Sequence, residues 1–330
     1  MPSTDMDLIV HSAGRDDDLR LALEDLRMDR YLAAKGLLRE TGYDWALRTS
    51  RSQVLAAGAA NNRAIDTWYD EEPSDPDALM MWARVLTQRV LNASRAGLSG
   101  QRLIRAVNAA SAACEAAATR WRADPVPHVC SLALAQTDID ERYPHKAVHW
   151  ATPRDRMLQR GPWLILDRVN ERDPYNREAY HRMLGVFHAR GRGGGLGFAQ
   201  WAASTALTGS PLKLLPHYAW VEIQRLQLEH GQRASVIAYW ASADKAYYAR
   251  QALYGWFAHI DPASSSLLDL NHMAHALTVT GEGHAGEVFE AIGPYATTAP
   301  WAMVTEKPQW WKSDFLSARR RALGVAGGCP

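Results

Sequence analysis

The chain has 330 residues, with 37 lysine and arginine residues, 36 aspartate and glutamate residues and a formal net charge of +1. This balance argues against a general attraction to nucleic acid or to acidic membranes. The three cysteines lack metal-type spacing, and the sequence has neither a signal segment nor a long apolar run, so we expect a cytoplasmic protein without disulfides or a membrane span.

The first part of the chain is predicted to be helical after a short tail. Residues 1–15 are polar, and we expect them to fray. Apolar residues recur at helical spacing within 19–26 and again within 31–38, which predicts two helices. A third helix is expected over 44–59, where an Asp-Trp pair begins it, and a shorter helix over 64–68.

Asp-Pro pairs divide the rest of the chain. An aspartate at this position can accept a backbone N–H of the first helical turn, and a proline at the first helical position gives up a donor that has no partner there. The first two intervals between pairs are equal, and the third is almost twice as long. An apolar run with helical spacing follows each pair. The pairs are Asp75-Pro76, Asp124-Pro125, Asp173-Pro174 and Asp261-Pro262.

Further helices are expected between these openers, and a last one near the end of the chain. They are placed within 103–121, 163–169, 214–226, 234–257 and 301–323. A two-helix unit that recurs roughly every 40 to 50 residues is typical of an α-solenoid, in which each hairpin buries its apolar face on its neighbours. Alternating β-type runs are absent. We therefore predict an all-α repeat domain over 16–322, between tails at 1–15 and 323–330.

Several short motifs resemble those of a known repeat family. Ala64, Trp68 and Pro76 match the spacing of a small residue, an aromatic residue and a proline in the second helix of tetratricopeptide (TPR) repeats. Leu184-Gly185 resembles the Leu-Gly of the first helix, and Trp201 stands where the second-helix aromatic residue would follow. The chain thus resembles a degenerate TPR protein with longer intervals. The resemblance implies a right-handed α-solenoid of stacked hairpins, with a concave groove that is lined by first helices and binds a peptide or protein.

Polar residues on the expected first helices are the candidates for such a groove. Within 175–188, a glutamate and two histidines lie opposite the apolar side of the helix, and within 267–277 two histidines do the same. We expect both sets to face the groove. The candidate binding residues are Glu178, His181, Arg182, His188, Arg192, His217, His272 and His275.

An enzyme on the same scaffold is the alternative hypothesis. Histidine titrates in the range needed for acid/base chemistry, and Glu178, Tyr180 and Glu222 could act with it. Glu178 and His181 also form a Glu-x-x-His motif of the kind found in di-metal helical bundles, but that template needs a second motif and two further glutamates. We therefore assign no catalytic residue, no metal ligand and no cofactor.

Three other features have two interpretations each. The glycine run at 191–197 is interpreted as a flexible turn, with anion binding as the alternative, because the strand, lysine and hydroxyl residue of a phosphate-binding loop are missing. The arginine-rich stretch 154–192 is interpreted as a solvated helix surface, with nucleic-acid binding as the alternative. Trp310-Trp311 cannot both face one core, so one of them is expected to cap the array or to touch a partner.

The sequence as a whole favours a binding protein. No complete catalytic motif is present, and the repeated hairpin is the dominant pattern. We predict a peptide- or protein-binding adaptor or regulator, with the helical-repeat enzyme as the alternative.

Overall fold

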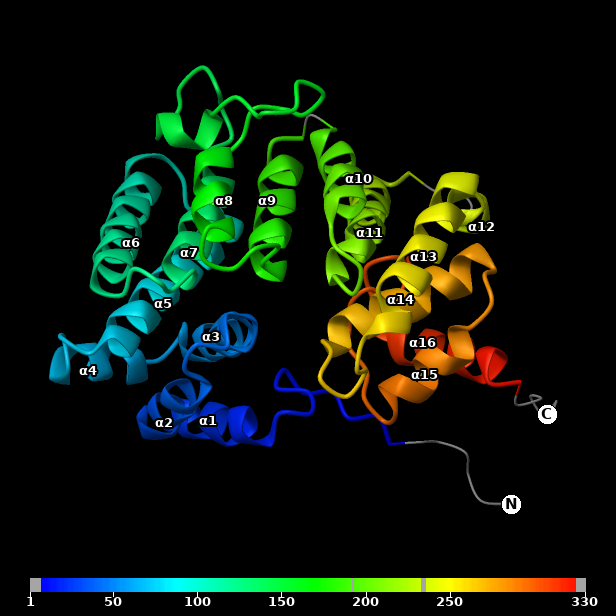
Figure 1. Ribbon diagram of the computed structural model, residues 1–330, viewed down its shortest axis with the longest axis horizontal. Coiled ribbons are helices and arrows are strands. Elements are labelled where there is room, and N and C mark those ends of the chain that lie inside the picture. The colour runs from blue at the N-terminus through cyan, green and yellow to red at the C-terminus, as the bar shows by residue number, and fades with distance from the viewer. Residues whose placement is uncertain (1–6, 192, 233–235, 325–330) are drawn as a thin grey trace. The chain divides into compact units, whose positions relative to one another are not determined.

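The computed structural model describes residues 7–191, 193–232 and 236–324, and within them the chain forms sixteen α-helices (Figure 1). Arg192 and Cys329 lie outside the described residues. The helices are α1 (Asp17–Arg27), α2 (Leu32–Thr41), α3 (Trp45–Ala59), α4 (Ala64–Glu71), α5 (Pro76–Arg95), α6 (Gly100–Arg120), α7 (Val126–Leu134), α8 (Trp163–Asn170), α9 (Arg177–Ala189), α10 (Gly194–Thr205), α11 (Leu215–Glu229), α12 (Val236–Trp240), α13 (Ala243–Gly255), α14 (Leu267–Thr280), α15 (Ala285–Ile292) and α16 (Trp311–Ala322).

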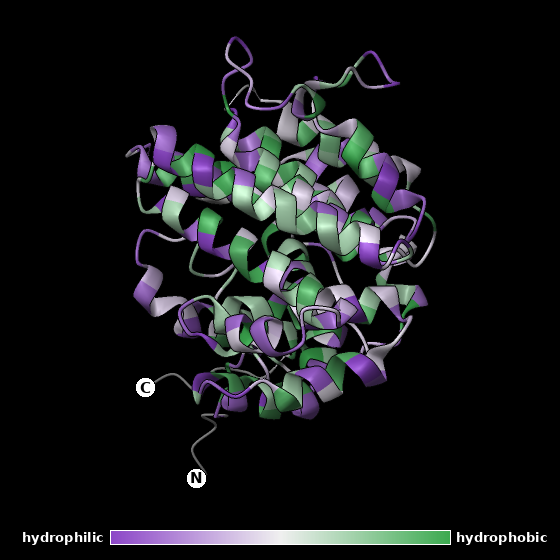
Figure 2. Ribbon diagram, turned by 90° about the vertical axis from the view of Figure 1, so that its left-hand side faces the viewer, coloured by the Kyte–Doolittle hydropathy of each residue, from purple (hydrophilic) through white to green (hydrophobic). Residues whose placement is uncertain are grey.

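The all-α prediction is confirmed, since the described ranges contain no strand and only two isolated β-bridges. Apolar and polar stretches alternate along most of the helical ribbons, as amphipathic helices require (Figure 2). None of the helices in the described part of the chain is both long enough and apolar enough to cross a membrane.

The chain divides into two compact units. Asp16–Phe198 forms the first, which we call the N-terminal unit. The described residues within Met1–Arg15 and Ala199–Pro330 form the second, which we call the C-terminal unit.

Two of the four Asp-Pro pairs begin a helix as predicted. Asp75 accepts a hydrogen bond from the backbone N–H of Asp77, and Pro76 is the first residue of α5. Asp124 accepts in the same way from Val126, where α7 begins. In both places the carboxylate satisfies a donor that the helix itself leaves without a partner.

The other two pairs lie within loops and do not begin a helix, so this part of the prediction was wrong. After Asp173-Pro174 the backbone of Tyr175 takes a positive φ of 61°, which interrupts helical geometry, and Asn176 caps α9 instead. Asp261 holds a turn by accepting from the N–H of Ala263, and α14 begins only after Ser266.

In the N-terminal unit, four helices pack in chain order: α3 on α5, α5 on α7, and α7 on α9. We call them the A helices. The helix before each also contributes, since α4 packs on α5 and α6 on α7. The apolar sides of these helices form the core, with Trp68, Met81 and Val129 fully buried.

Arg48 on α3 joins the first turns of the A helices. Its guanidinium is fully buried and forms ion pairs with Asp77 of α5 at 2.6 Å and with Asp124, just before α7, at 2.9 Å. It also lies over the ring of Trp121, 4.5 Å from the ring centroid. One cation thus neutralises two carboxylates, one in the first turn of α5 and one just before α7, and links the starts of three helices.

In the C-terminal unit, α14 is the central helix and packs against α13, α15 and α16. Leu270, Met273 and Leu277 of α14 are fully buried among aromatic residues that include Phe289 and Phe315. All residues from Asp269 to Leu277 are buried, so this stretch of the helix has no side facing solvent.

Residues 7–15 belong to this second unit, although residues 1–15 were predicted to fray; residues 1–6 lie outside the described residues. The N–H of Ile9 donates to the carbonyl of Pro294 at 2.9 Å, and the N–H of Ala296 donates to the carbonyl of Ile9 at 3.0 Å. Arg15 donates to the carbonyl oxygens of Pro262, Ala291 and Ile292. The polar composition of this segment predicted a frayed tail, but its hydrogen bonds to backbone groups hold it in place.

Two expected helices are shorter than predicted. The stretch 234–257 divides into α12 and α13, because the chain leaves helical geometry after Trp240 and Ser242 caps a new helix. The stretch 301–323 becomes helical only from Trp311, after a 3-10 turn at Pro308–Trp310. In both cases a capping residue or a proline sets where the helix begins, which the spacing of apolar residues does not determine.

Candidate functional site

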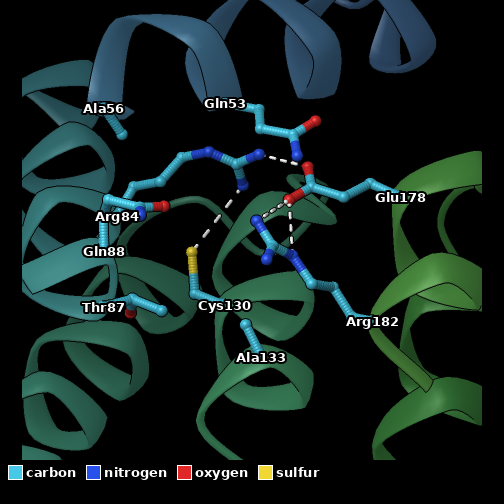
Figure 3. A pocket seen from close by; sticks show the side chains of 9 residues that line it. All are labelled: Gln53, Ala56, Arg84, Thr87, Gln88, Cys130, Ala133, Glu178 and Arg182. Carbon is cyan, nitrogen blue, oxygen red and sulfur yellow. Dashed lines mark hydrogen bonds and ion pairs between the residues drawn. The ribbon is translucent and has the colours of Figure 1, made fainter. Parts of the chain in front are cut away.

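The A helices of the N-terminal unit bring together a cluster of charged side chains that we call the Arg84 cluster: Arg84, Glu178 and Arg182 (Figure 3). One terminal nitrogen of Arg84 on α5 donates hydrogen bonds to Glu178 of α9 and, at 3.1 Å, to the carbonyl oxygen of Thr49 on α3. The other carboxylate oxygen of Glu178 accepts from Arg182, one helical turn further on, at 2.8 and 3.0 Å. The cluster therefore carries two positive charges and one negative charge.

The opposite charges in the cluster keep one another ionised. Burial acts to raise the pKa of Glu178, but the guanidinium groups of Arg84 and Arg182 outweigh it and hold that pKa below its usual value. Burial likewise acts to lower the pKa of Arg84, and the Glu178 carboxylate more than offsets this. Both groups are thus charged at neutral pH, and an unpaired charge at this depth would be strongly unfavourable.

A cavity of about 10 Å³ lies over the cluster, which is room for about one water molecule. Side chains from all four A helices line it: Gln53, Ala56, Arg84, Thr87, Gln88, Cys130, Ala133, Glu178 and Arg182. Figure 3 shows Arg84 and Glu178 meeting from opposite sides, with Cys130 below them. Glu178 is only 4% exposed, so it forms the floor of a shallow depression rather than the open face that the sequence predicted.

A buried thiol completes the surroundings of Arg84. The second terminal nitrogen of Arg84 lies 3.8 Å from Sγ of Cys130 and donates to it. Cys114 of α6 lies 3.8 Å from the Thr87 hydroxyl. Both cysteines are free thiols.

The remaining candidates on α9 are half-buried. Burial, together with the charges of Arg177 and Arg182, holds the pKa of His181 well below its usual value, so this histidine is neutral at neutral pH. The ring of His188 packs on Gly195, where a Cβ atom would lie only 3.0 Å from it. Part of the glycine run is therefore helical, because α10 begins at Gly194 and uses the missing side chain for close packing. Arg192 lies outside the described residues.

The C-terminal unit brings three of the predicted histidines together. Nε2 of His217 on α11 lies 3.1 Å from Nδ1 of His275 on α14, and the ring centroid of His272 is 5.6 Å from that of His217. The ring of His272 stacks on Tyr218 at 3.5 Å. Convergence of these side chains is a feature that the sequence left undecided.

The histidines of α14 do not face a groove, so this expectation was wrong. His272 and His275 are each 2% exposed, because α14 is packed on all sides. Trp240 and Trp301 pack edge-on against the ring of His275, both with centroids 5.2 Å away. The result is a buried aromatic cluster.

Burial also decides the charge of this cluster. It lowers the pKa of His275 to about 3, and burial with the two neighbouring histidines lowers the pKa of His217 well below its usual value. Across the described residues, no group of three or more histidine, cysteine, aspartate or glutamate side chains is arranged to hold a metal ion.

The residues named for the alternative enzyme are engaged in packing and ion pairs. Glu222 is bound by Arg225 at 2.6 Å, three residues further along α11. Tyr180 is buried, accepts from the amide of Asn170 at 3.4 Å and stacks on Phe198. Each side chain thus has a structural partner, whichever activity the chain has.

Sequence reasoning missed three residues of the Arg84 cluster and its surroundings: Arg84, Cys130 and Cys114. Arg84 falls among buried residues of α5, between Ala83 and Val85. An arginine at an apolar position of a helical wheel was the available signal, because such a residue needs a buried acid as partner. No family model, curated protein or solved structure matches this chain.

Proposed function

We propose that the protein is a helical-repeat binding module, an adaptor or regulator that recognises a peptide or protein through the A-helix face of its N-terminal unit. The order of packing supports this proposal. Each A helix from α5 onward packs on the A helix before it and on the helix between them, as stacked hairpins of a TPR-like solenoid do. Stacking of this kind leaves one side of successive A helices as a continuous surface.

The observation that carries the proposal is the polar depression on that surface. Its rim is formed by the half-buried side chains of Gln53, Gln88 and Arg182, which come from three different A helices. Amide and guanidinium groups that converge from separate helices are suited to backbone or side-chain groups of a bound peptide. The floor is too small to admit a side chain, so the partner lies across the rim.

The charge of the depression favours an acidic partner. Arg84 is neutralised by Glu178, while Arg182 shares the same carboxylate and reaches the rim, with its side chain 17% exposed. A carboxylate on the partner would give Arg182 a second anionic ligand in fixed geometry.

Site-specific crosslinking tests the location. A photoreactive amino acid at Gln53 or at Gln88 is expected to capture one discrete protein in cells, whereas the same group at Arg105, exposed on α6, is expected to capture none. Equal capture from all three positions would mean that the depression is not the binding surface.

A charge reversal tests the chemistry. We expect Arg182→Glu to abolish capture from position 53, and Arg105→Glu, a matched reversal on an outer helix, to leave it unchanged. Circular dichroism of both variants checks that the helices remain folded. Undiminished capture by folded Arg182→Glu protein would contradict the acidic partner. Absence of capture from positions 53 and 88 when Arg182 is unchanged would contradict the binding function itself.

A further inference from the structure

Another cavity lies within the C-terminal unit, between the end of α11 and the connection from α15 to α16. Its volume is about 490 Å³, which is in the range of small-molecule sites. Leu228 from α11 and Ala302, Met303 and Pro308 from the connection give it an apolar lining. The cavity over the Arg84 cluster has room for about one water molecule, whereas this one can admit an organic molecule.

The connection is held in place on both sides of the residues that line the cavity. The buried ring of Trp301 donates from Nε1 to Oδ1 of Asn271 on α14 at 3.1 Å. The carbonyl oxygen of Val304, also a buried residue, accepts from Nε2 of Gln224 on α11 at 3.5 Å. These bonds attach the connection to two helices, so the cavity is preformed.

The charged groups around the cavity are mainly acidic. Among the described residues that line it, Arg225 is the one cation, and it is already bound by Glu222 at 2.6 Å and by Glu229. Glu306 lines the cavity from the connection, is exposed, and has no ion-pair partner in the described ranges. Three carboxylates thus stand against one guanidinium, which favours a cationic ligand.

Two further features add to the negative charge that a ligand would meet. The helix α11 ends at the cavity, with Glu229 as its last residue, and the C-terminal end of a helix carries a partial negative charge. Lys307 follows Glu306 in the chain but does not line the cavity, and its Nζ lies 4.6 Å from the ring centroid of Trp310. The ammonium group of Lys307 is therefore engaged elsewhere.

We propose that this cavity binds a linear aliphatic polyamine, whose ammonium groups donate to Glu229 and Glu306 while its methylene chain packs on Leu228 and Met303. Primary and secondary ammonium groups have N–H donors, and a carboxylate accepts hydrogen bonds from them. A quaternary ammonium lacks such donors and is recognised by aromatic rings, which are absent from the described lining residues.

Two other kinds of cation fit the cavity less well. A magnesium ion requires several oxygen ligands around a small volume, and it would leave the apolar lining uncovered. A lysine-rich peptide offers ammonium groups, but its backbone N–H and C=O groups would need partners that an apolar lining does not supply. The site lies in the C-terminal unit and uses none of the residues of the A-helix face, so it stands whether or not that face binds a partner.

Isothermal titration calorimetry of the full chain tests the proposal with spermidine as the probe. We expect saturable one-to-one binding of spermidine. Butylamine, which has a single ammonium group and can reach only one of the two carboxylates, should bind about tenfold more weakly or worse. A tripeptide of lysine with the same net charge as spermidine should also bind more weakly, and magnesium chloride should show no saturable binding at the same concentrations.

Variants test the location. Glu306→Gln is expected to weaken spermidine binding about tenfold, because it removes the charge from one acceptor. Met303→Lys puts an ammonium group into the cavity and should abolish binding. Glu287→Gln removes an exposed carboxylate of α15 that does not line the cavity, so it is the matched control and should leave the affinity unchanged. Circular dichroism checks that the variants remain folded.

Several results would overturn the proposal. Absence of spermidine binding would do so, as would equal or tighter binding of the lysine tripeptide or of magnesium. An equal effect of Glu306→Gln and Glu287→Gln would show a diffuse attraction of cations rather than a site. Glu306 is exposed, so its substitution remains informative even if Met303→Lys does not fold.

Discussion

At the scale of single residues, Glu178 shows how a polar candidate can be essential to stability without being exposed. It is the shared acid of Arg84 and Arg182, and its loss would leave a buried guanidinium without an anion. We expect Glu178→Gln to lower the free energy of unfolding by about 3 kcal/mol or more, the range found when one partner of a buried pair is removed. Urea titration followed by circular dichroism measures this change.

A matched substitution on the surface provides the control. Glu171 forms an ion pair with Arg172 but is exposed, so Glu171→Gln should change the free energy of unfolding by less than about 0.5 kcal/mol. Equal effects of the two substitutions would mean that the Arg84 cluster is solvated rather than buried.

The Glu178 carboxylate also makes the free energy of unfolding depend on pH. The pKa of Glu178 is lower in the folded chain than its ordinary value of 4.5, so the folded state binds fewer protons. Its contribution to stability is complete above pH 4.5 and is lost as the pH falls further toward the folded pKa. We expect the free energy of unfolding to decrease below pH 4.5 in the natural sequence and to decrease less steeply in Glu178→Gln, as measured by urea titrations at several pH values.

The sequence located some of these residues and missed others for one physical reason. Helical periodicity states which residues share a face, and it placed Glu178 and His181 opposite the apolar side of their helix. Whether such a face meets solvent or a buried cation depends on a residue far away in the sequence, here Arg84. Periodicity within one helix carries no information about that partner.

At the scale of helices, the pair of His217 and His275 joins α11 to α14 as neutral groups. Burial holds the pKa of His275 at about 3 and that of His217 well below 6.5, so both bind a proton more readily in the unfolded chain. Stability from this pair is complete above pH 6.5 and decreases as the pH falls toward 3. His275 alone accounts for at most about 1.4 kcal/mol per pH unit in that window.

Hydrogen exchange of the α14 amides measures this contribution. We expect exchange from the C-terminal unit to show a loss of protection in α14 between pH 7 and pH 5, after correction for the intrinsic rates. In His275→Gln the loss should be smaller, because one titrating group is gone. An unchanged pH dependence in that variant would show that His275 is not the group responsible.

Arg48 is the corresponding link among the A helices, and its removal is expected to be costly. In Arg48→Met the carboxylate of Asp124, which is 1% exposed, would remain buried without its cation. We expect a loss of about 3 kcal/mol or more in the free energy of unfolding, measured by urea titration. Adding Asp124→Asn should restore part of it, since the amide carries no charge. If the double variant is no more stable than Arg48→Met, the ion pair is not the cause.

The Asp-Pro pattern explains how far helix starts could be predicted. At Asp75 and Asp124 the side chain accepts from an N–H two residues later and a helix begins there. Asp261 makes the same contact with Ala263, but it holds a turn, and α14 begins only after Ser266. Asp173 does not begin a helix, because its carboxylate accepts from the side chain of Asn176, and Asn176 then caps the helix itself. The choice between two adjacent capping residues depends on tertiary contacts, such as that between Asn176 and Thr49 of α3.

At the scale of the whole molecule, the assignment of chain segments to units could not be predicted from composition. The polar segment before α1 was expected to be a tail, yet Ile9 and Arg15 bind backbone groups of the C-terminal unit more than 240 residues further along the chain. Contacts at such separation leave no periodic signal in the sequence. The all-α class was predictable, by contrast, because amphipathic spacing is local.

This attachment makes a specific prediction for the C-terminal unit. Ile9→Pro removes the N–H that binds Pro294, and Arg15→Gln removes a guanidinium that donates to Pro262, Ala291 and Ile292. Hydrogen bonds from a charged donor contribute about 1.5–3 kcal/mol each at most. The Ala296 amide donates to Ile9, so its hydrogen exchange reports on this attachment. We expect that exchange to become about tenfold faster or more in the double variant. Arg27→Gln, at an exposed position of α1, is the control and should leave that amide protected. Unchanged exchange of Ala296 in the double variant would show that the segment is a free tail after all, and the C-terminal unit would then be complete without it.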